Sequence, residues 1–107
     1  MNPTAYTNCA LLLKTIGHPL RLAILESLKD GEKCVSDVCE IVNTPQPNVS
    51  QHLSVLRSVG LVNVVETGNM RSYSIAHHEM IGGILDVLTE YCLKRRRATM
   101  FEQDEST

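Results

Sequence analysis

The chain has 107 residues, a formal charge of −2 and four cysteines. This length fits one small domain, and domains of this size often gain stability by oligomerising. The sequence has neither a charged-then-apolar leader nor an apolar run near membrane-spanning length, so we expect a soluble, cytoplasmic protein. It also lacks a nucleophile elbow, a phosphate-binding glycine loop and an HExxH pair, which argues against an enzyme.

Charge is distributed unevenly along the chain. Glu102, Asp104 and Glu105 are three of its 12 acidic residues, which leaves nine acidic residues against ten basic ones in the rest. We expect one domain over residues 1–100 and a disordered acidic tail over residues 101–107. The basic run over residues 94–97 is typical of a solvated helix end.

Two helices are predicted before residue 31. The amphipathic pattern after Thr4 predicts a helix that stops at Gly17 and could form a dimer arm. Pro19 opens a second helix, which ends near Asp30 and Gly31. Its core candidates are the apolar residues Leu22, Ile24, Leu25 and Leu28.

A short helix is predicted next, over residues 37–43, and residues 33–35 before it could form a small strand. Ser36 is a reasonable cap for this helix. Its buried side would consist of Val38, Ile41 and Val42. Residues 43–45 then make a tight turn, so a helix, a turn and a second helix follow one another.

Residues 44–59, TPQPNVSQHLSVLRSV, have the pattern of a recognition helix. Thr44 can cap the helix, and Pro45 suits its first position because proline has no N–H to leave unpaired. One narrow apolar stripe is formed by Val49, Leu53 and Leu56. The residues that face outward are Gln46, Pro47, Asn48, Gln51, Ser54 and Ser58.

This outward face has almost no charge. Arg57 is the one charged residue of the stretch, whereas a plain surface helix usually carries Glu and Lys pairs. Asparagine and glutamine can pair with adenine in the major groove, and carboxylates would be repelled by phosphate. The composition therefore favours DNA recognition, with an ordinary amphipathic surface helix as the alternative.

A hairpin and a long helix complete the pattern. The predicted strands LVNVVE and RSYSI flank Thr67, Gly68, Asn69 and Met70. They form a wing in which Asn69 and Arg71 could contact DNA, Arg71 through a phosphate. The long helix, over residues 77–97, places Ile81, Ile84, Leu85, Leu88 and Cys92 on one side. Apolar terminal helices suit a symmetric dimer, whose two recognition helices would enter successive major grooves of an inverted-repeat operator roughly 34–36 Å apart.

Four linked motifs resemble the ArsR/SmtB family of winged helix-turn-helix repressors, which sense metals, metalloids or sulfur species. They are HPLRLAILESL, CVSDVC, PQPNVSQHLSVLRSVGLV and ETGNMRSYSI. The resemblance implies a mainly α fold with a small β-hairpin wing, a homodimer formed by the first and last helices, and release from double-stranded DNA when an inducer binds. It also implies DNA contacts from Gln46, Asn48, Ser50, Gln51 and His52. For His52, a packed or capping histidine is an equal alternative.

The inducer site is expected at cysteines. The arsenic-sensing branch of the family has a motif like CVCDLC, whose first and last thiols correspond to Cys34 and Cys39, while Ser36 replaces the middle one. Two helical cysteines five residues apart would point about 140° apart, but an extended Cys34 could fold back toward Cys39. Cys9 from a second subunit could complete the site, as an N-terminal cysteine does in related cadmium and lead sensors. Thiolates of this kind suit arsenite, antimonite or a soft divalent ion.

Several alternatives stay open at this point. A free cysteine is often a small buried hydrophobe, which we expect for Cys92 and consider equally for Cys9. Zinc-sensing relatives use the last helix, where His77, Glu79 and Glu90 fall near the metal positions. A thiol-redox or persulfide sensor is the main rival, although such relatives have a cysteine in the second helix, which lacks one here. DNA binding itself should need no cofactor, and a winged-helix module that binds protein is a further possibility.

Overall fold

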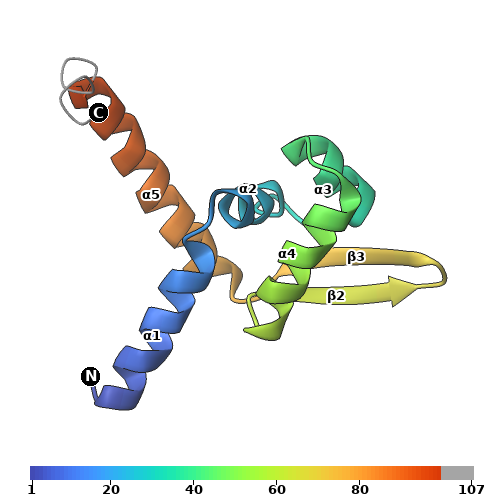
Figure 1. The fold of residues 1–107 in the computed structure, drawn as a ribbon, viewed down its shortest axis with the longest axis horizontal. Coiled ribbons are helices and arrows are strands. Elements are labelled where there is room, and N and C mark those ends of the chain that lie inside the picture. The colour runs from blue at the N-terminus through green and yellow to red at the C-terminus, as the bar shows by residue number, and fades with distance from the viewer. Residues whose placement is uncertain (100–107) are drawn as a thin grey trace.

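The structure is a computed structural model that describes residues 1–99, with side-chain surroundings through Arg95. Its helices are α1 (Pro3–Ile16), α2 (Pro19–Ser27), α3 (Val35–Val42), α4 (Gln46–Ser58) and α5 (His78–Thr99), and its strands are β1 (Lys33–Cys34), β2 (Val62–Thr67) and β3 (Met70–Ile75). This is the predicted mainly α fold with a hairpin wing (Figure 1). The expected tail, residues 101–107, lies outside the described residues, as do the side chains of Arg96 and Arg97.

The core lies where α2, α3 and α4 pack over the base of the hairpin. The predicted apolar stripe of α4 is fully buried there, with Val49, Leu53 and Leu56 all 0% exposed. Residues of α2 and α3 cover it: Ile24, Leu25, Leu28 and Val38. In Figure 1 the hairpin projects from one side of this core, and α1 and α5 leave it on the other side, diverging from each other.

The turn between α3 and α4 differs from the prediction. Thr44 does not cap α4; its hydroxyl donates back to the carbonyl of Val42 over 3.0 Å, and its N–H donates to the carbonyl of Cys39 over 3.1 Å. The reason is the left-handed backbone of Asn43 (φ 52°), which closes α3 and makes Thr44 part of that closure. The helix α4 therefore begins at Gln46, with Pro45 as its N-cap residue.

The predicted cap of α3 is also wrong. Cys34, not Ser36, is the N-cap residue, and Ser36 lies inside the helix. The cause is the pairing of β1 with the wing, in which Cys34 lies opposite Ser72. This pairing keeps Cys34 in extended backbone until the helix begins at Val35, so that β1, β3 and β2 form one three-stranded antiparallel sheet.

The hairpin forms as predicted, with a shorter turn. Thr67 and Met70, expected between the strands, pair with each other, which leaves Gly68 and Asn69 as the two turn residues. Gly68 has φ 62° at the first of these positions, where a type II′ turn requires a positive φ. The turn therefore presents Asn69 and the neighbouring Arg71 at the end of the wing that lies farthest from α1 and α5 (Figure 1).

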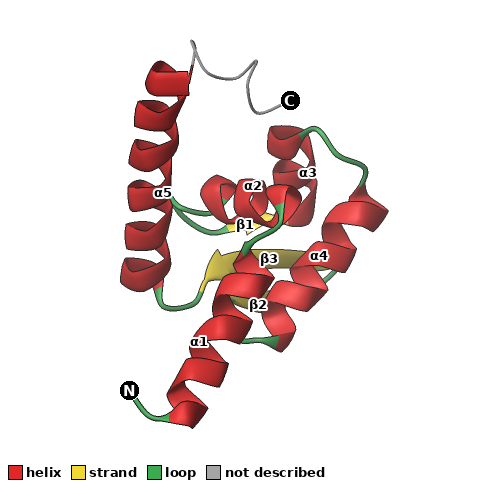
Figure 2. Ribbon diagram, turned by 60° about the vertical axis from the view of Figure 1, so that its left-hand side comes forward, coloured by secondary structure: helices red, strands yellow, loops and turns green. Residues whose placement is uncertain are grey.

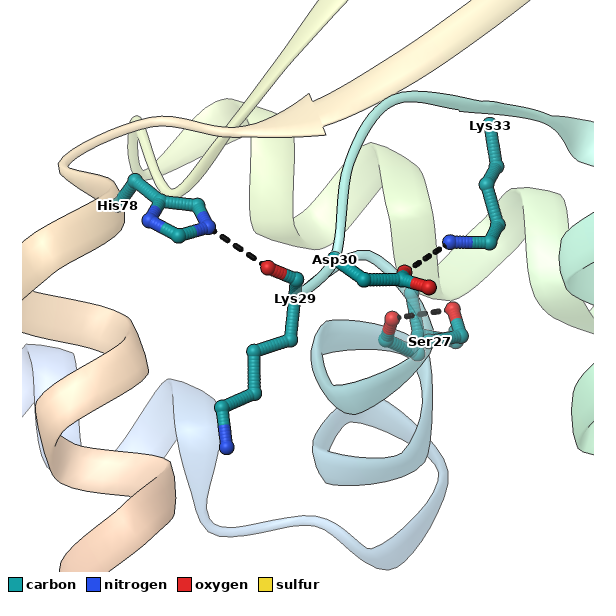
Figure 3. Close-up of polar contacts among 6 residues, drawn as sticks. Ser27, Lys29, Asp30, Lys33 and His78 are labelled. Carbon is teal, nitrogen blue, oxygen red and sulfur yellow. Dashed lines mark hydrogen bonds and ion pairs between the residues drawn. The ribbon is translucent and has the colours of Figure 1, made fainter.

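The first turns of α5 are bonded to the segment that follows α2. Ile81 and Leu85 are buried in the core, and the ring of His78 bonds through Nε2 to the carbonyl oxygen of Lys29 over 2.7 Å (Figure 3). The side chain of Lys29 also pairs with Asp86, and this contact raises the pKa of Lys29. Leu85 is the last buried residue of α5 through Arg95, and the C-terminal end of the helix extends beyond the body (Figure 2).

Two predictions of burial are wrong for the single chain. Ile41 is 55% exposed, and Cys92 is exposed as well. Leu88, on the same side of α5 as Cys92, is 39% exposed. The helix α3 turns Val38 to the core and leaves Ile41 exposed, and Leu88 and Cys92 line an open groove between α2 and α5. None of the helices within residues 1–99 combines the length and apolarity needed to cross a membrane.

Candidate nucleic-acid interface

The face of α4 opposite the core is polar and open to solvent. Gln46, Asn48 and Gln51 are exposed, and Ser50 is half-buried beside the stripe. No side chain caps the start of this helix, and the N–H groups of Asn48 and Val49 donate to the carbonyl of Pro45 over 3.1 and 3.2 Å. The exposed amide side chains are therefore the groups that can contact base edges.

His52 occupies a different setting from these amides. Its ring is half-buried and lies 4.5 Å from the ring of His18, centroid to centroid. Its Nδ1 accepts a hydrogen bond from Nε of Arg21 over 3.2 Å. Burial lowers the pKa of His52, and electrostatic interaction with His18 and with the guanidinium of Arg21 lowers it further. The packing favours the alternative of a structural histidine, and a direct DNA contact from His52 stays a prediction.

Arg21 is the residue that reasoning from the sequence missed. It lies 31 positions before its partner His52, so neither helical periodicity nor a local motif relates the two. The available signal was an arginine in the first turn of α2, where a positive charge is unfavourable for the helix dipole and therefore calls for a compensating contact.

Asn69 and Arg71 lie on the wing as predicted, and both are exposed. Arg71 lies directly across the hairpin from Glu66, and its Nε is 3.1 Å from the Glu66 carboxylate. The pair is solvent-exposed and therefore contributes little to stability. Its relevance is electrostatic, because Glu66 offsets the charge that Arg71 would offer a phosphate.

The cysteines of the expected inducer site are both half-buried, and Cys34 has the extended backbone on which that site depends (φ −74°, ψ 159°). Its sulfur lies 3.1 Å from the hydroxyl of Ser36, while Cys39 packs against the core from α3. Cys9 is exposed on α1, and its thiol contacts the sulfur of Met1 at 3.7 Å. Within residues 1–99 of a single chain, no three histidine, cysteine or acidic side chains gather as a metal site. The three-cysteine site, which takes Cys9 from a second subunit, stays a prediction.

The alternative residues on the last helix are dispersed. His77 adopts a left-handed backbone (φ 54°) before α5 begins, and Glu79 lies in the first turn. Glu90 pairs with Lys94 over 3.1 Å, three turns further along. Cys92 lines an open, mainly apolar groove of about 540 Å³ between α2 and α5.

Comparison with known proteins identifies the family. The model of the bacterial regulatory proteins of the ArsR family matches residues 18–64, from the cap of α2 into β2. The arsenical resistance operon repressor of Staphylococcus xylosus is 33% identical over 86 residues, which are 78% of this chain and 83% of that protein. The chain belongs to the ArsR family.

Other ArsR-family regulators show the same similarity. The transcriptional repressor SmtB of Mycobacterium tuberculosis is 34% identical over 77 residues, which are 72% of this chain but 57% of SmtB. The chain thus spans little more than half the length of that relative. The crystal structure of the transcriptional repressor BigR from Xylella fastidiosa superposes with a TM-score of 0.76 at 28% identity, covering 82% of this chain and 89% of BigR. These relatives are named as repressors, in agreement with the expectation of a protein that is not an enzyme.

The ion pair of Arg71 with Glu66 on the wing predicts how the charge of Glu66 affects DNA affinity. Glu66→Gln removes a carboxylate beside Arg71, so we expect affinity for duplex DNA to rise by about two- to fivefold, the size of an exposed charge interaction. The dependence on salt should also steepen, because Arg71 would then engage phosphate fully. Fluorescence anisotropy over a salt series measures both quantities. Glu90→Gln, which breaks an exposed ion pair on α5, is the matched control; equal effects in the two variants would rule out a contact by the wing.

Proposed function

We propose that the chain is a transcriptional repressor that binds an inverted-repeat operator as a homodimer. The observation that carries this proposal is the buried stripe of α4, because it turns an amide-rich, acid-free face to solvent. Membership of the ArsR family and the named repressors among the relatives support the same function.

The two arms support a dimer. Large apolar side chains lie exposed on the helices that leave the body: Tyr6, Leu11 and Leu13 on α1, and Val87, Tyr91 and Leu93 on α5. Exposed apolar surface of this extent usually marks an interface. A two-fold dimer through α1 and α5 would cover these side chains and leave both α4 helices and both wings free.

The inducer in this proposal is arsenite, antimonite or a soft divalent ion bound by Cys34 and Cys39, with Cys9 of a second subunit as third ligand. Soft thiolates fit such ions, and a reducing cytoplasm, where we place the protein, would keep the four thiols free. The resemblance of CVSDVC to the arsenic-sensing motif and the similarity to an arsenical resistance repressor support this choice.

The position of Cys34 suggests how binding could release DNA. Cys34 lies opposite Ser72 of β3, next to Arg71 on the wing, and Cys39 belongs to the helix whose final turn leads into α4. An ion that draws the two sulfurs together would pull β1 and α3 toward each other. Both the wing and the start of α4 are attached to these segments, so their spacing would change.

DNA binding is tested with the duplex upstream of the gene that encodes the chain. Gln51→Ala removes an amide from the outward face of α4 and should weaken specific binding by about tenfold or more, the value of one base contact. Anisotropy titrations on this duplex and on a scrambled one measure the ratio of specific to non-specific affinity. The affinity of the unaltered chain should fall steeply as salt rises. Binding that is independent of salt, or no binding at all, would favour a protein-interaction module instead.

The inducer site is tested by single substitutions. Cys34→Ser and Cys39→Ser should keep DNA affinity within about twofold, because neither side chain faces DNA, but should abolish release by arsenite. Cys92→Ser is the matched control and should be released like the unaltered chain. Normal release of both variants would refute the site.

The rival inducer class is separated by mass spectrometry of the released protein. A thiol-redox or persulfide sensor would gain a linked pair of cysteines after sulfane-sulfur treatment, with no bound metal. Release by sulfane sulfur and not by arsenite would replace the proposed inducer with this one.

A further inference from the structure

Three helices of the chain are joined by one arginine. Arg21 donates through Nε to Nδ1 of His52 on α4 over 3.2 Å, and through Nη1 to the carbonyl of Thr15 on α1 over 3.1 Å. The ring of His18, which precedes α2, packs on the ring of His52 at an interplanar angle of 40°. We call Arg21 with His18 and His52 the His–Arg–His clamp.

The clamp holds the arm α1 at the point where the arm joins the body. Thr15 and Ile16 are the buried residues of α1, and most of the helix before them is exposed. The Thr15 carbonyl belongs to the last turn of α1, where carbonyls have no partner within the helix. Arg21 supplies that partner, and its positive charge also suits the negative end of the helix dipole. Figure 2 shows α1 passing beside α4 at this junction.

The other side of the clamp holds the recognition helix. His52 is adjacent to Gln51 and one turn after Asn48, the two exposed amides on which DNA recognition is proposed to depend. A guanidinium group has a planar set of donors with fixed geometry, so Arg21 can bond two helices at once without rotating. Arg21 therefore links the end of the arm to the recognition helix through one rigid group.

We propose that Arg21 is a positioning residue for DNA binding, which uses the clamp to fix the orientation of α4 relative to the dimer arm. In a two-fold dimer, the angle between arm and recognition helix determines the spacing of the two α4 helices on the duplex. The inference rests on the proposed function, since it concerns binding by a dimer. It adds a residue that touches no DNA but controls whether both helices can bind together.

The chemistry of the clamp makes it sensitive to acid. Because Nδ1 of His52 accepts from Arg21, the ring must be neutral with its proton on Nε2. A protonated ring could not accept this bond and would place a second positive charge beside Arg21. The titratable and charged groups that act on His52 come from α2 and its cap, Arg21 and His18. With its pKa below the ordinary 6.5, His52 loses the bond progressively as pH falls below that value.

The central test is the salt dependence of Arg21→Gln. We expect its affinity for the upstream duplex to fall about tenfold, as for a recognition element held less firmly, with an unchanged slope of log affinity against log salt. A slope reduced by about one would make Arg21 a phosphate contact and overturn the proposal, as would an unchanged affinity. Lys14→Gln removes a neighbouring positive charge outside the clamp and should bind like the unaltered chain.

Substitutions of His52 keep the test independent of any folding defect in Arg21→Gln. His52→Gln retains an oxygen that can accept from Arg21 at every pH, whereas His52→Leu does not. The affinity of His52→Gln should stay constant as the pH is lowered, whereas the affinity of the unaltered chain should fall. His52→Leu should resemble Arg21→Gln. Affinity that rises in acid for the unaltered chain alone would show a phosphate contact by His52 and overturn the proposal.

An NMR titration of His52 tests whether the clamp forms, and DNA binding then distinguishes failure of the proposed function from failure of this inference. In the free protein, the pKa of His52 should lie below 6.5 and should rise in Arg21→Gln, and an equal value in both proteins would show that the clamp does not form. If the unaltered chain does not bind the duplex, the proposed function fails and the inference falls with it. If it binds and the variants bind equally well, the inference alone fails.

Discussion

The burial of one face of α4 is the constraint on which the rest of the structure depends. Val49, Leu53 and Leu56 are completely removed from water, and each Å² of apolar surface so buried contributes about 25 cal/mol. The helix cannot rotate about its axis without exposing this stripe, so its amides are held in solvent on the opposite side. The direction of the recognition surface is thus a consequence of core packing, and the segments that pack on α4 are the ones able to adjust it.

Two connections to α4 stand out, and they lead to different parts of the molecule. The left-handed turn at Asn43 joins α4 to α3 and, through Cys34, to the wing. Arg21 joins α4 to the arm α1. In our proposal the first connection carries the response to a thiophilic inducer, and the second sets the geometry of the dimer on DNA. Both act on a helix whose own face does not change.

The sequence predicted much of this arrangement because helical and hairpin signals are local. The stripe of α4 and the hairpin of β2 and β3 depend on residues close together in the chain, and both are confirmed. The predicted starts of α3 and α4 were wrong for two reasons. Cys34 pairs with Ser72 of β3, which is distant in the sequence, and Asn43 closes α3 so that Thr44 bonds to the end of that helix. Periodicity identified Cys92 as part of an apolar face but could not show that this chain alone leaves the face uncovered. The contact of Arg21 with His52 depends on tertiary packing; an arginine in the first turn of a helix signals a contact but does not identify its partner.

The most direct measurement of the central claim is the pattern of bases protected on the upstream duplex by the unaltered protein. Two recognition helices related by two-fold symmetry should protect two major-groove patches on one face of the DNA, with centres about 10–10.5 base pairs apart and two chains bound per site. A single patch, or two patches on opposite faces of the duplex, would contradict the account.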